Sequence, residues 1–174
     1  MTTSSPAAVS GSGAKVLPVD QYVAALPRKR MAAGVLFWCG TNRVLLVEPS
    51  YKPNWEIPGG AVEPDESPWT TAAREVAEEL GWDRPLGRLL VVDYVRPQDS
   101  RPEGVVFVFD GGPLTDQDVG GLDFADGEIV SASLRTIEEA RTKVKPLLAD
   151  RLEAALAALA EGVTVLCEQG RRIS

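Results

Sequence analysis

Three glutamates and one arginine lie close together in the sequence, at a spacing that suits cation binding. Glu75, Glu78 and Glu79 fall at positions i, i+3 and i+4, and Arg74 precedes them. On a helix, with ~100° of rotation per residue, the three carboxylates share one face. Carboxylates that close repel one another, and Mg²⁺ relieves the repulsion because it takes oxygen ligands. The spacing predicts a metal platform; a solvated acidic face is the ordinary alternative.

A helix over Pro68–Leu80 would position these side chains. Ser67 is a good N-cap, Pro68 suits the first helical position, and Gly81 is placed to end the helix. The apolar face of this helix would be formed by Ala73, Val76, Ala77 and Leu80. We expect that face to pack on a core, nearly opposite the three glutamates.

The segment around this helix resembles the Nudix box, the signature of a hydrolase family. The box reads Gly, five residues, Glu, seven residues, Arg-Glu-aliphatic, one residue, Glu-Glu, one residue, Gly-apolar. The chain fills these positions with Gly60, Glu66, Arg74, Glu75, Val76, Glu78, Glu79, Gly81 and Trp82. Trp82 is bulky where the family usually has an aliphatic residue. Residues 55–60 also keep the family's approach to the box, and the layout of the termini resembles that of actinobacterial members.

The resemblance covers roughly residues 30–160 and implies an α/β fold of the α+β kind, with a mixed β-sheet sandwiched between helices (α/β/α). Apolar runs predict strands over Met31–Cys39, Val44–Val47, Trp55–Gly59, Leu89–Val95, Val105–Phe109, Glu128–Leu134 and Val163–Leu166. Further helices are expected over Val19–Leu26, Ile137–Thr142 and Pro146–Glu161. Gly111–Gly127 is interpreted as a long loop, and the end of the chain as a polar tail. Residues 1–14 are interpreted as a disordered tail before a single domain, 15–174.

For activity, the resemblance implies hydrolysis of a diphosphate linked to another moiety, most often a nucleoside. Glu75, Glu78 and Glu79, with the carbonyl of Gly59, would hold Mg²⁺, with Mn²⁺ as an alternative. A water on that ion could then attack phosphorus. Glu75 and Glu78 are the box carboxylates expected to take part in catalysis.

Two further box residues are expected to have positioning roles. Arg74 would pair with a neighbouring carboxylate and fix its rotamer rather than touch substrate. Glu66 would hold the loop-to-helix geometry or bind a second-shell water.

The general base is less narrowly defined by the resemblance. In the family it is either a box glutamate or an acidic residue on a distant loop. The distant candidates here are Asp123, Asp126 and Glu128, and position before the following strand favours Asp123. A plain solvated loop acid is the alternative for each.

Substrate contacts are predicted at four residues, Tyr51, Trp55, Tyr94 and Arg96. Packing in the core or at its rim is the ordinary role of each aromatic. Arg101 and the run Arg28–Arg30 are further candidates for phosphate contact. Nothing in these residues selects among nucleoside triphosphates, ADP-ribose, dinucleoside polyphosphates and non-nucleotide diphosphates.

Composition sets limits on other functions. The 174 residues suffice for one domain, and the net charge of −7 argues against a general nucleic-acid binder. The chain has no histidine, which excludes His-based nucleophile systems, and its two cysteines give no disulfide framework. The sequence has no signal segment or membrane-spanning run, so a cytoplasmic protein is expected, with a homodimer as an open prediction. A ligand sensor on the same fold is the alternative function, but such members usually lose box carboxylates and this chain keeps them all.

Overall fold

One mixed eight-stranded sheet organises the described part of the computed structural model, residues 17–98, 101–122, 124 and 127–174. The strand order is β6-β2-β1-β5-β4-β7-β8, and β3 pairs with β1 off this path. The β1–β5 and β4–β7 pairs are parallel and the other pairs are antiparallel. The strands are β1 (Arg30–Cys39), β2 (Arg43–Pro49), β3 (Gly59–Ala61), β4 (Leu89–Val95), β5 (Gly104–Pro113), β6 (Ile129–Thr136), β7 (Val165–Glu168) and β8 (Arg171–Arg172).

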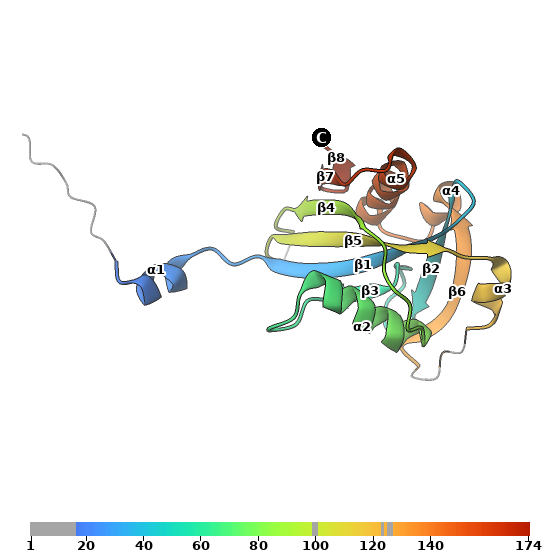
Figure 1. Cartoon of the computed structure of the whole chain (residues 1–174), viewed down its shortest axis with the longest axis horizontal. Coiled ribbons are helices and arrows are strands. Elements are labelled where there is room, and N and C mark those ends of the chain that lie inside the picture. Colours follow the sequence, from blue (N-terminus) through green and yellow to red (C-terminus); the bar gives the residue numbers. More distant parts are fainter. Residues whose placement is uncertain (1–16, 99–100, 123, 125–126) are drawn as a thin grey trace, which may run out of the picture.

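Helices cover both faces of the sheet, which confirms the predicted sandwich (Figure 1). The helices are α1 (Val19–Ala25), α2 (Pro68–Leu80), α3 (Asp116–Gly120), α4 (Ile137–Ala140) and α5 (Pro146–Glu161). Helices α2 and α5 lie on opposite sides of the sheet, while α1 stands apart and buries none of its residues. Among the described residues, no helix is long and apolar enough to cross a bilayer. The predicted tail, residues 1–14, lies outside the described residues.

Strand β1 separates two apolar clusters because successive side chains of a strand point to opposite faces. Val35 and Phe37 belong to the cluster that also contains Val76 of α2. Leu36 belongs to the other cluster, with Leu152 of α5. The strand is therefore fully buried at its centre, and α2 is held against the face on which the predicted site lies.

The capping signals place both long helices where the sequence predicts them. The Ser67 hydroxyl accepts a hydrogen bond from the Thr70 amide at the start of α2. Gly81 ends the helix in the left-handed region, with φ of 66°. Helix α5 likewise begins at a proline and ends before Gly162, with φ of 73°.

The predicted long loop over Gly111–Gly127 is wrong in its first half. Strand β5 continues through Pro113, because this stretch pairs with the end of β1. Helix α3 follows, with Thr115 and Asp118 forming a reciprocal capping box. The Thr115–Asp118 spacing was the sequence signal for this helix.

Two other element boundaries differ from the prediction. The run Trp55–Gly59 forms only a single bridge at Glu56, and strand β3 begins at Gly59 instead. The strand predicted over Val163–Leu166 is observed as β7, which begins at Val165 and lies in the interior of the sheet between β4 and β8. The expected polar tail therefore contributes the edge strand β8.

A buried ion pair between α5 and β4 also holds the turn of the hairpin formed by β7 and β8. Arg151 of α5 donates to Asp93 of β4 at 2.7 Å, and the Asp93 side chain is fully buried. Asp93 also accepts from the backbone amide of Gly170, at 3.0 Å and 3.1 Å to its two oxygens. Only a residue without a side chain fits at Gly170, because an added Cβ would lie 2.5 Å from the Leu147 carbonyl oxygen. A paired, hydrogen-bonded charge is the form in which burial is tolerated.

Candidate active site

Two glycines bring the backbone of β3 against the acidic helix. Gly59 has a φ of 145°, and an added Cβ would lie 2.3 Å from the Ala33 carbonyl oxygen. A Cβ added at Gly60 would lie 2.1 Å from Oε1 of Glu75. The absence of side chains therefore lets the Glu75 carboxylate sit directly on the backbone of the loop.

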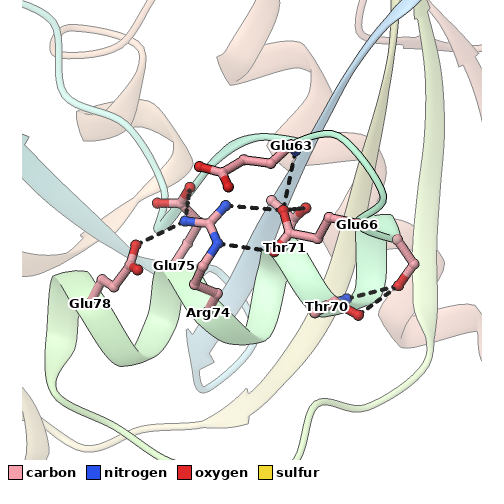
Figure 2. A network of polar contacts seen from close by, with 8 residues as sticks. Glu63, Glu66, Thr70, Thr71, Arg74, Glu75 and Glu78 are labelled. Carbon is pink, nitrogen blue, oxygen red and sulfur yellow. Dashed lines mark hydrogen bonds and ion pairs between the residues drawn. The ribbon is translucent and has the colours of Figure 1, made fainter.

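Arg74 lies at the centre of a network of carboxylates (Figure 2). Its Nε donates to Glu66 at 2.9 Å, and its Nη2 donates to the second oxygen of Glu66 at 3.1 Å. Its Nη1 donates to Glu75 at 3.0 Å and to Glu78 at 2.8 Å. This planar, forked contact is the arrangement in which Arg fixes carboxylate rotamers. The contacts are those expected of a positioning residue.

Glu66 links the loop to the helix. Its carboxylate accepts from the Thr71 hydroxyl at 2.6 Å and from the Glu63 amide at 3.2 Å, in addition to Arg74. The Arg74 guanidinium, then the Thr71 hydroxyl, lower the pKa of Glu66 to about 2. Because each partner favours the charged carboxylate, the network is held together by ionised Glu66.

We predict that Glu66→Gln destabilises the protein at neutral pH but not in acid. The pKa of Glu66 is depressed in the folded state, so its contribution is present above its ordinary value of 4.5 and is lost as pH falls towards about 2. Thermal unfolding of both proteins between neutral pH and about pH 3 should show the difference shrinking below about pH 4.5. Glu63→Gln is the matched control, since Glu63 contributes its backbone amide to the network. A difference between wild type and Glu66→Gln that stays constant with pH would contradict this account.

Glu79 and Glu75 are desolvated carboxylates that face the glycine loop. Glu79 accepts from the Gly59 amide at 3.0 Å. Burial, with the charges of Glu75 and Glu128, raises the pKa of Glu79 to about 8, although the Gly59 amide and Lys52 act in the opposite direction. Burial is also the main cause of the raised pKa of Glu75, to which the charges of Glu78 and Glu128 add. These two carboxylates therefore repel each other in a poorly solvated place.

The predicted cluster of three glutamates is not assembled in this structure. Glu78 is turned to Arg74, and its side chain is 57% exposed. Among the described residues, no three His, Cys, Asp or Glu side chains are grouped closely enough to hold a metal ion. Glu75, Glu79 and Gly59 nevertheless fit a hard cation, because two desolvated carboxylates side by side gain most from a positive charge.

The buried face of α2 is rotated from the predicted one. Ala77 is exposed and Ala72 is fully buried instead. On a helical wheel of ~100° per residue, Ala72, Val76 and Leu80 span one side, and Glu79 falls next to Ala72. This rotation is the reason why Glu79 is more desolvated than Glu78.

Of the distant acidic candidates, the structure describes one near the box. Glu128 precedes β6, its carbonyl accepts from the Ser50 amide at 2.8 Å, and its charge raises the pKa of both Glu75 and Glu79. The favoured candidate, Asp123, and Asp126 lie outside the described residues.

A cavity of about 400 Å³ opens beside Gly59 and Gly60. None of the four predicted substrate residues lines it, but Lys52, Val95 and Arg101 do. Two of the further candidates for phosphate contact, Arg30 and Arg101, do line the cavity, whereas Lys52 and Val95 were not predicted. Alternation along β4 was the available signal, since neighbours in a strand face opposite ways.

The four predicted residues make other contacts. Tyr94 donates its hydroxyl to Glu103, and Arg96 donates to Glu168 at 2.7 Å. Trp55 is half-buried against the core, with the Lys143 ammonium 4.4 Å from its ring centroid. Tyr51 is 70% exposed after β2. The part of the chain that the structure describes thus gives these residues packing or surface contacts, and their roles with substrate stay predictions.

Parts of the chain are similar in sequence to a known domain family and to characterised proteins. The model of the NUDIX domain matches residues 28–157. A segment of 68 residues is 47% identical to Diphosphoinositol polyphosphate phosphohydrolase 2 of Rattus norvegicus, covering 38% of this chain and 37% of that protein. The match therefore spans well under half the length of this relative.

Solved structures share the fold at low sequence identity. A NUDIX hydrolase from Nitrosomonas europaea superposes with a TM-score of 0.62 at 19% identity, covering 82% of this chain and 80% of that one. An ADP-ribose pyrophosphatase from Streptococcus suis superposes with a TM-score of 0.59 at 18% identity, covering 81% and 99%. These likenesses support the architecture described above.

Proposed function

The chain belongs to the Nudix family and is a Nudix hydrolase, and from that premise we propose that it cleaves a diphosphate linkage with Mg²⁺ held by Glu75, Glu79 and Gly59. The observation that carries the proposal is the pair of desolvated carboxylates against the Gly59–Gly60 backbone. Mn²⁺ could replace Mg²⁺, since carboxylate and carbonyl oxygens suit both ions. Glu78 would join the metal site only after leaving Arg74.

The side chains would divide the work in the following way. A bound divalent cation supplies a nucleophilic water and neutralises phosphate charge. Arg74 keeps Glu75 in its rotamer, and Glu66 anchors Arg74 to the loop. We propose that Glu128, whose charge acts on both Glu75 and Glu79, takes the proton of the attacking water, while Asp123 stays a prediction.

Two types of substrate are supported by the names of similar proteins. The ADP-ribose pyrophosphatase from Streptococcus suis agrees with the predicted nucleoside diphosphate linked to another group. The rat relative, a diphosphoinositol polyphosphate phosphohydrolase, points to a diphosphate on a phosphorylated ring instead. Hydrolysis of a diphosphate is common to both, while the attached group and the expected homodimer stay predictions.

A screen of diphosphate compounds with product identification tests the proposed function. We expect the purified chain to cleave at least one compound with Mg²⁺ present and none with excess EDTA, because the carboxylates alone give no nucleophilic water. Mass spectrometry of products formed in ¹⁸O-labelled water would also identify the phosphorus that is attacked. Tight binding of a compound with no product after long incubation would favour a sensor over a hydrolase.

A further inference from the structure

The cavity beside the glycine loop is basic, although the chain as a whole carries a net charge of −7. Its cationic lining residues are Arg30, Lys52, Arg101, Lys145 and Arg151. Glu56 is the one acidic side chain among the described residues that line it. A local excess of positive charge on an acidic protein attracts anions to that place.

Two of these cations are already neutralised by the protein. Arg151 pairs with buried Asp93, and Lys52 lies 3.1 Å from Glu56. Within the described ranges, Arg30, Arg101 and Lys145 form no ion pair. Among the described residues, the Arg30 side chain donates only through Nε, to the Pro102 carbonyl at 2.9 Å, which leaves its other guanidinium donors for a ligand.

The three uncompensated cations come from separate parts of the chain. Arg30 begins β1, Arg101 lies in the connection from β4 to β5, and Lys145 is the N-cap residue of α5. They meet at one cavity whose wall includes Gly59 and Gly60 of the proposed metal site. A diphosphate at the glycine loop would therefore have its attached group among these cations.

The same cavity offers no aromatic surface among the described residues that line it. A nucleobase gains much of its binding energy by stacking on aromatic rings. The nearby Trp55 ring packs on the core, and the Tyr94 hydroxyl is engaged by Glu103. The lining is therefore suited to charged groups rather than to a flat base.

We infer that the group attached to the scissile diphosphate is itself a polyanion, carrying further phosphates that bind Arg30, Arg101 and Lys145. This inference rests on the proposed function for the position of the diphosphate. Arginine suits the assignment because its fork binds phosphate oxygens in pairs, and lysine adds a mobile point charge.

Equilibrium binding in Mg²⁺-free buffer tests the inference without any bond cleavage. The probes are inositol hexakisphosphate, a phosphorylated ring without a diphosphate, and adenosine monophosphate. By calorimetry, we expect the first to bind more tightly. Arg101→Gln and Lys145→Gln should each weaken its binding about tenfold, the value of one charge-assisted hydrogen bond. The matched control is Arg135→Gln on β6, outside the cavity lining, for which we expect a change of less than about twofold.

The outcomes separate this inference from the proposed function. Equal or tighter binding of adenosine monophosphate, or equal effects of all three variants, would overturn the polyanion assignment. Hydrolysis of ADP-ribose would still uphold the proposed function in that case. Thermal unfolding of each variant controls for folding, and Arg101→Lys should recover part of the lost affinity because it restores the charge.

Discussion

Replacing Glu79 by glutamine is expected to lower kcat roughly a thousandfold while leaving the protein folded. A bound metal ion contributes several kcal/mol of transition-state stabilisation, and about 1.4 kcal/mol corresponds to a factor of ten in rate. In the wild type, Oε2 of Glu79 accepts from the Gly59 amide at 3.0 Å. Glutamine keeps the shape of this side chain, and its amide oxygen can accept the same hydrogen bond. It removes the negative charge that a hard cation requires.

Folding and metal binding can be measured separately in the same variant. Because a neutral amide replaces a desolvated carboxylate, the thermal stability of Glu79→Gln without metal should equal or exceed that of the wild type. Added MgCl₂ should raise the unfolding temperature of the wild type and raise that of the variant much less. Glu138→Gln, on the exposed side of α4, is the matched control. Unchanged kcat and an unchanged response to MgCl₂ in Glu79→Gln would remove this residue from the metal site.

The parts of the fold that local chemistry determines were predictable from the sequence. Ser67, Pro68 and Gly81 fix the ends of α2 because capping depends on residues within one turn. Pro146 likewise marks the start of α5, and the helical spacing of its buried residues, such as Leu148, Leu152 and Ala155, marks its apolar face. The box residues could be located by their spacing alone.

The missed features depend on contacts between distant parts of the chain. Strand β5 continues to Pro113 because this stretch pairs with β1. The two glycines before Pro113, Gly111 and Gly112, carry no local pattern that predicts a strand. The rotation of α2 that buries Ala72 and exposes Ala77 is decided by the sheet beneath it. The cavity is lined by segments far apart in the sequence, so its basic character appeared only once the fold brought Arg30 and Lys145 together.

Glu128→Gln is expected to lower kcat about a hundredfold, at the lower end of what a positioned general base contributes. The reason is that its charge raises the pKa of both Glu75 and Glu79, the proposed metal ligands. The substitution keeps the backbone contact, because the Glu128 carbonyl, not its side chain, accepts from Ser50.

The dependence on Mg²⁺ distinguishes a base from a metal ligand at Glu128. For a base, kcat falls while the Mg²⁺ concentration giving half-maximal rate changes by less than about threefold, since the ligands Glu75 and Glu79 remain. For a ligand, saturating Mg²⁺ would restore much of the rate. Asp123→Asn is the direct comparison, because sequence position alone favoured Asp123. If Asp123→Asn loses most of its kcat while Glu128→Gln keeps a normal rate, Asp123 is the general base and Glu128 is not.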